Sequence, residues 1–131
     1  MREHSIELRV RYDEVDSMGY VHHSNYLRYF EIGRTELLRA SGGRYRDMEG
    51  AAQRVVVVHV DCRYRKPACY DDLITIKTRI DKVTAGKIVH RYEISRSEER
   101  LVDATVTLAV VDPEGNLQRV PESLIELYGE L

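Results

Sequence analysis

The segment from Arg11 to Gly43 constrains the fold most, because a polar loop joins a strand pattern to a long helix pattern within it. Ahead of this loop, apolar side chains alternate with charged ones, which predicts a strand half buried on a core. The side chains expected to face the core are those of Ile6, Leu8, Val10 and Tyr12. The chain therefore enters the loop from a sheet.

Behind the loop, apolar or small residues recur at intervals of three and four, as on one face of an amphipathic helix. These residues are Tyr26, Phe30, Gly33, Leu37 and Ala40. Ser24 or Asn25 is expected to cap the start of the helix, and Gly42 with Gly43 to end it. Glu31 and Arg34 are expected to form an intrahelical ion pair.

The loop itself contains the carboxylate of Asp16 and the flexible Gly19, followed by His22 and His23 at the expected helix start. The first amide N–H groups of a helix have no partner inside the helix, so they can bind an oxyanion. The sequence thus predicts a carboxylate close to an anion-stabilising helix end.

The remaining chain is rich in strand patterns. Strands are expected over Ala51–Arg65, Leu73–Val83, Lys87–Ser95 and Leu101–Val111. The segment Arg44–Gly50 lacks apolar periodicity and is expected to be a connection, whereas Asp112–Asn116 is a turn and a short helix starts at Pro121. This order predicts an α+β fold in which an antiparallel five-stranded sheet wraps one long central helix.

Composition narrows the class of protein. A chain of 131 residues predicts a single domain, 1–131, and no apolar run approaches the roughly 20 residues that span a bilayer. The net charge of −2 argues against a general nucleic-acid binder. Met1 to His4 lead into the first strand without an apolar signal segment, so a cytoplasmic location is expected, with Cys62 and Cys69 unpaired.

Two motifs resemble those of hotdog-fold acyl-CoA thioesterases, specifically the 4-hydroxybenzoyl-CoA thioesterase-like group with the Tol-Pal-associated enzymes. The first is Tyr12-x-x-x-Asp16-x-x-Gly19-x-Val21-x-His23-x-x-Tyr26, continued by Tyr29-Phe30-Glu31-x-x-Arg34-Thr35-Glu36. The second is Tyr64-x-x-Pro67-Ala68-x-Tyr70-Asp71-Asp72. The resemblance implies the hotdog fold and hydrolysis of acyl-CoA thioesters to free acid and coenzyme A.

The resemblance also assigns site residues. Asp16 matches the family's catalytic carboxylate, acting as nucleophile or as the general base that activates water. The backbone N–H of His23 matches the donor that polarises the thioester carbonyl, while its side chain can orient Asp16 or water or simply cap or pack. Gly19 allows the loop to bend through a conformation closed to residues with a Cβ and lets the substrate approach the backbone closely. Tyr12 is expected either to hydrogen-bond Asp16 or to pack.

Substrate binding is expected to involve His59, Arg65, Lys66 and Lys87. His59 lies in the apolar strand run Val55–Val60, which is expected to pair with its copy in a homodimer. The resemblance implies the same dimer, often paired again to a homotetramer. That strand would help to wall the acyl pocket through Val56, Val58 and Val60. The phosphates of coenzyme A need cations, and the clusters available are Arg63, Arg65 and Lys66, then Lys87 and Arg91.

No cofactor is expected, because coenzyme A is part of the substrate. The histidines lack a His-Glu-x-x-His spacing and adjacent His22 and His23 cannot easily aim at one ion, so no metal is predicted. Two other functions stay open, a non-catalytic acyl-CoA sensor and a hotdog dehydratase or isomerase. The intact Asp16 loop disfavours the first, and the second lacks a matching His/Glu pattern.

Overall fold

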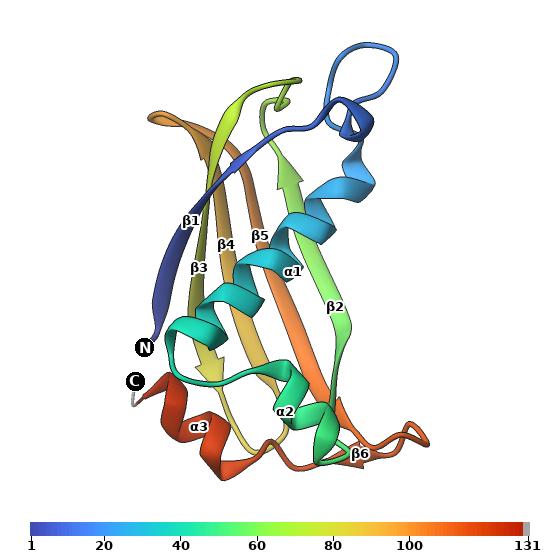
Figure 1. Ribbon diagram of the computed structural model, residues 1–131, viewed down its shortest axis with the longest axis vertical. Coiled ribbons are helices and arrows are strands. Elements are labelled where there is room, and N and C mark those ends of the chain that lie inside the picture. Colours follow the sequence, from blue (N-terminus) through green and yellow to red (C-terminus); the bar gives the residue numbers. More distant parts are fainter. Residues whose placement is uncertain (130–131) are drawn as a thin grey trace.

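The computed structural model describes residues 1–129 and consists of one antiparallel sheet with a long helix packed against it (Figure 1). Its helices are α1 (His23–Ala40), α2 (Tyr45–Gly50) and α3 (Glu122–Tyr128). Its strands are β1 (Glu3–Arg9), β2 (Arg54–Tyr64), β3 (Leu73–Val83), β4 (Ile88–Arg96), β5 (Glu99–Val111) and β6 (Leu117–Gln118). The strand order is β1-β3-β4-β5-β2, and the short β6 pairs with β5. The predicted α+β architecture is confirmed.

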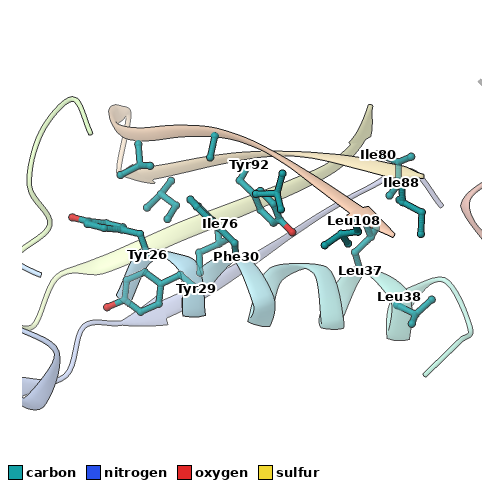
Figure 2. Packing of buried hydrophobic residues seen from close by; sticks show 14 of the residues in the cluster. Tyr26, Tyr29, Phe30, Leu37, Leu38, Ile76, Ile80, Ile88, Tyr92 and Leu108 are labelled. Carbon is teal, nitrogen blue, oxygen red and sulfur yellow. The ribbon is translucent and has the colours of Figure 1, made fainter. Parts of the chain in front are cut away.

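The core lies between α1 and the sheet face that it crosses. Figure 2 shows Tyr26, Phe30 and Leu37 on α1 pointing toward the strands, where the Phe30 and Tyr92 rings stack with centroids 4.5 Å apart. The helix approaches β3 closely at Gly33, where a Cβ atom would overlap Thr78 Oγ1 and stand 3.0 Å from Ile76 Cγ2. The intervals of three and four residues identify the buried face of α1 correctly from Tyr26 to Leu37, whereas Ala40, at the end of the helix, is exposed.

The prediction for the first strand is wrong at its C-terminal end, where the strand is shorter than expected. Strand β1 stops at Arg9, and Tyr12 begins a short 3₁₀ turn, η1 (Tyr12–Glu14), with 77% of its side chain exposed. The ladder with β3 ends where Arg9 pairs with Leu73, so the chain beyond it is free to turn. Tyr12 therefore does not face the core, although the alternation of the sequence extends to it.

Two further expectations need correction. The segment expected to be only a connection contains α2, a helix too short to display a full apolar repeat. The cap of α1 is His22 rather than Ser24 or Asn25, since the His22 side chain accepts a hydrogen bond from the backbone N–H of Ser24. The turn over 112–116 and the last helix are confirmed.

Strand β2 forms an edge of the sheet, as its apolar run predicted, but it is not buried in the described chain. The exposed fractions of Val57 and Val58 are 46% and 57%. Helix α1 packs chiefly on β1 and β3, so most of β2 lies beyond its cover. A register shift between Val57 and His59 marks a bulge in the pairing of β2 with β5.

The cysteine and ion-pair predictions are confirmed. Cys62 and Cys69 are both free thiols. Arg34 Nη2 lies 3.6 Å from Glu31 Oε1, and its guanidinium also stands over the Tyr45 ring at 5.2 Å. Among residues 1–129, no helix has the length and apolar character needed to cross a membrane.

Candidate active site

The loop that carries Asp16 is fixed by its own backbone. The Asp16 N–H donates to Tyr20 O at 2.8 Å, and the Gly19 N–H donates to Asp16 O at 3.0 Å. Gly19 has φ +80°, a left-handed conformation that residues with a Cβ rarely adopt. The conformation of the turn therefore explains why glycine is favoured at this position.

The Asp16 carboxylate uses one oxygen for the turn and leaves the other free. Its Oδ1 accepts hydrogen bonds from the backbone N–H groups of Met18 at 2.9 Å and Tyr20 at 3.2 Å. Within residues 1–129, no donor is bonded to Oδ2. The side chain is exposed, so this oxygen can meet a reactant.

The start of α1 offers a free donor beside this loop. The His22 N–H donates to Glu14 O at 2.9 Å, and Ser24 N–H is taken by His22 Nδ1 at 3.3 Å. Within the part of the chain that the structure describes, the His23 N–H is bonded to no acceptor. The positive end of the helix dipole adds to the attraction of this donor for an oxyanion.

The loop is tied to α1 through Glu14, a residue to which the sequence analysis assigned no role. Glu14 O accepts from Asn25 Nδ2 at 2.8 Å, while its carboxylate Oε1 accepts from Arg11 N–H at 2.7 Å and from Tyr29 Oη at 3.1 Å. Burial and the neighbouring Glu14 carboxylate raise the pKa of the Tyr29 hydroxyl, so it stays a donor. No sequence motif marks this tie.

Asp16 and His23 line one open cavity of about 330 Å³ at the end of β2. Tyr20, Val21, Tyr26, Tyr64 and Pro67 supply its less polar wall, and Arg65 with Lys66 complete the lining. Tyr26 and Tyr64 have ring centroids 5.3 Å apart, and Tyr26 Oη accepts from the Ala68 N–H at 3.2 Å. The two tyrosines were matched by the motifs but not assigned to the site.

Arg65 and Lys66 reach this cavity as expected, but acidic side chains of β5 already pair with them. Arg65 Nε contacts the Asp103 carboxylate, and Lys66 Nζ lies 2.8 Å from Glu99 Oε2. Hydrogen bonds from Lys66 and Arg96 hold the pKa of Glu99 below its usual range. Their charge at the cavity is thus largely balanced.

The other three predicted site residues lie away from the cavity within this chain. Exposed Tyr12 packs edge-on against Tyr70 with ring centroids 5.3 Å apart, and has no hydrogen bond to Asp16. His59 is exposed on the edge strand opposite Thr107. Lys87 follows the β3–β4 turn, at the opposite end of the sheet from the Asp16 loop (Figure 1).

The site contains no obvious metal centre. In residues 1–129, no three His, Cys, Asp or Glu side chains come together in a group that could hold a metal ion. The chemical groups present are a free carboxylate oxygen, a free helix N–H and a partly apolar cavity. Such a set can activate water or attack a carbonyl while the carbonyl oxygen is stabilised.

Residues 18–102 match the model of the thioesterase superfamily. This chain belongs to that superfamily. Relatives named as acyl-CoA thioester hydrolases or thioesterases show that it is an enzyme of the hydrolase class, and its fold is the hotdog fold, as the motifs implied.

Several similar proteins match this chain over most of its length. It is 30% identical to the acyl-CoA thioester hydrolase YbgC of Escherichia coli O6:H1 over 90% of each chain. A crystal structure of protein AQ1494 from Aquifex aeolicus has a TM-score of 0.91 at 30% identity, over 95% of this chain and 98% of that one. A structure of 4-hydroxybenzoyl CoA thioesterase with its substrate has a TM-score of 0.90 at 20% identity, over 98% and 100% of the two chains, a likeness of fold alone.

Proposed function

We propose that this chain hydrolyses acyl-CoA thioesters to the free acid and coenzyme A without a cofactor. The observation that carries the proposal is that Asp16 and His23 line the same cavity, one with a free carboxylate oxygen and the other with a free backbone N–H. The acyl-CoA thioester hydrolase YbgC, a full-length relative, supports the choice of substrate class.

In the proposed reaction, the thioester carbonyl oxygen points at the His23 N–H, which stabilises the negative charge of the tetrahedral intermediate. Asp16 Oδ2 acts on the carbonyl carbon in one of two ways. As nucleophile it forms an anhydride and expels coenzyme A as the thiolate, and water then hydrolyses the anhydride. As general base it takes a proton from the water that attacks.

The neighbouring residues have supporting roles in this proposal. The hydrogen bonds of Met18 and Tyr20 to Oδ1 hold the carboxylate of Asp16, which lines the cavity, and leave Oδ2 for the reaction. Gly19 permits the turn that makes both bonds, and the His23 side chain lines the cavity where it can orient water. The tyrosine rings of Tyr26 and Tyr64 flank the thioester and limit the access of bulk water.

We also propose that two copies share the site through β2. The edge strand has unpaired backbone groups and exposed valines, a combination that favours pairing with a second copy. Antiparallel pairing would set the end of β2, with the Asp16 cavity, beside the start of the partner's β2. A second cavity of about 250 Å³, lined by Val55, Gln53 and Arg34 among others, opens at that start.

In this assembly α1 and the partner's β2 wall the acyl pocket, and His59 lies at the seam. A further pairing of dimers to a tetramer and a cytoplasmic location are retained as predictions; the two free thiols fit a reducing compartment. Dilution with simultaneous sedimentation and activity measurement tests the shared site, since a fully active monomer would contradict it.

A thiol-release assay over short, long and aromatic acyl-CoA esters tests the proposed reaction. We expect release of coenzyme A from at least one ester class, abolished in the Asp16→Asn variant. A non-catalytic sensor would bind esters without releasing thiol. A dehydratase or isomerase would change the acyl group while leaving the thioester intact, which mass spectrometry of the products detects.

A further inference from the structure

A hollow of about 420 Å³ lies on the face of the sheet that is turned away from α1. Arg91 and Glu93 alternate on β4 with buried Tyr92 and Ile94, so their side chains leave the opposite side of the sheet from the core. Four arginines from β2, from the residue that follows it, from β4 and from β5 converge around this hollow, which we name the arginine cleft. They are Arg63, Arg65, Arg91 and Arg100.

Only part of this positive charge is neutralised by the protein. Arg65 and Arg100 both pair with the Asp103 carboxylate, and Arg100 Nη2 also lies 3.1 Å from Glu93 Oε2. Within residues 1–129, Arg63 and Arg91 form no ion pair with any carboxylate. Asp61 also lines the cleft, so four arginines face the three carboxylates of Asp61, Glu93 and Asp103. The guanidinium groups of Arg63 and Arg91 carry the excess positive charge and are available to an anion.

The cross-strand register adds an independent observation, a pair of like charges beside the cleft. Arg91 stands directly opposite Arg79 of β3, and like charges at such positions destabilise a sheet. Glu3, which is opposite Arg79 on β1, forms its ion pair with Lys77 at 3.5 Å. An anion bound between the strands would offset this repulsion.

The floor of the cleft leaves room for such an anion. Thr105 is paired with Arg91 on one side and with Asp61 on the other, and it is a short side chain among long ones. Its hydroxyl adds a hydrogen-bond donor beneath the guanidinium groups. Planar guanidinium forks bind phosphate oxygens in a bidentate manner, which makes phosphate the anion that this set fits best.

We propose that the arginine cleft binds a phosphate-bearing ligand through Arg63 and Arg91. Arg65 lines both this cleft and the Asp16 cavity, so the phosphates of the coenzyme A substrate are one source. A separate phosphorylated metabolite that binds the outer face is the other. The first source rests on the proposed thioesterase function, whereas binding in the cleft does not.

Calorimetry with pyrophosphate and with 3′,5′-ADP at low salt tests the cleft itself. The double variant Arg63→Gln/Arg91→Gln should bind both probes about tenfold more weakly than the wild type. Arg46→Gln on the helix side of the sheet, an exposed arginine outside the cleft, should bind like the wild type. Equal affinity of the wild type and the double variant, or no binding by the wild type, overturns the proposal.

Kinetics with two thioesters of the same acyl group separate the two sources. If the substrate's phosphates occupy the cleft, the double variant raises KM about tenfold for the coenzyme A ester and leaves it unchanged for the pantetheine ester, which has no phosphate. If a separate ligand binds, KM is unchanged for both esters while 3′,5′-ADP binding is lost. A rise for both esters overturns the proposal, because the arginines then act on the fold or on the reaction.

Thermal melting provides a readout that does not depend on turnover. Without added anion, Arg91→Gln should melt at or above the wild-type temperature, since it removes the repulsion with Arg79. Pyrophosphate should raise the Tm of the wild type and not that of the double variant. A failure of thioester hydrolysis alone would leave these binding results standing, so the two proposals fail separately.

Discussion

Tyr29 Oη donates a 3.1 Å hydrogen bond to Glu14 Oε1, and this contact joins the buried face of α1 to the turn that leads into the Asp16 loop. The same helix supplies the His23 N–H, so the bond sets the position of the proposed nucleophile or base relative to the proposed oxyanion donor. The buried Tyr29 hydroxyl thus helps to hold the Asp16 loop in position relative to α1.

Replacing Tyr29 by Phe should lower kcat by about tenfold with little change in KM, because the loop loses one of its ties to α1. The free energy of unfolding should fall by about 1 kcal/mol. Steady-state kinetics and urea denaturation measure the two effects. Glu14→Gln should keep most activity, since its amide oxygen can still accept from Tyr29; a loss as large as that of Tyr29→Phe would argue for a charge effect of Glu14 instead.

Replacing Asp16 by Asn should reduce kcat by roughly two orders of magnitude or more, because the amide is neither an effective nucleophile nor a base. The matched control is Asp13→Asn, an exposed carboxylate of the same loop region outside the cavity, which should retain activity. His23→Ala should be milder than Asp16→Asn, as the backbone donor survives. Near-normal turnover in a folded Asp16→Asn variant would remove Asp16 from the chemistry.

Replacing Gly33 by Ala should destabilise the fold by about 1–3 kcal/mol, although alanine is the better helix former. The added methyl group would overlap Thr78 Oγ1. Chemical denaturation of the single variants and of Gly33→Ala/Thr78→Ala checks this as a double-mutant cycle. The second substitution should recover part of the loss; additive losses would show that the contact is not the cause.

His90 should make stability depend on pH. It is fully buried, and neither ring nitrogen has a hydrogen-bond partner within residues 1–129; burial, then the Arg34 charge, lowers its pKa to about 3. The folded pKa lies below the unfolded value near 6.5, so the stabilisation is fully present above pH 6.5 and falls by up to about 1.4 kcal/mol per unit as pH drops toward 3. Denaturation from pH 7 to 4 measures the slope, which should be shallower in His90→Leu.

Replacing Val58 by Asp should dissociate the proposed dimer and reduce activity with it, because a charge would be buried at the β2 seam. Leu117→Asp is the control, since Leu117 is also exposed but lies on β6, away from the edge formed by β2. Sedimentation and activity across a dilution series measure both properties. An active monomeric Val58→Asp variant would contradict the shared site.

Local patterns in the sequence determined the elements and their order. The intervals from Tyr26 to Leu37 identified the buried face of α1, and the Asp16 motif identified the loop and the superfamily. Gly19 could be identified from the sequence because the left-handed conformation of this turn excludes most side chains. A single glycine is enough to reveal such a requirement. These features depend on neighbours within a few positions along the chain.

Tertiary structure alone decided which distant residues meet. The outward position of Tyr12 follows from where the β1–β3 ladder ends, and the tie between Glu14 and Tyr29 follows from how α1 lies against the loop. Arg63 and Arg91 converge only because β2, β5 and β4 are neighbours in the sheet. Strand order and register set these contacts, and neither is encoded in the spacing of residues along a single strand.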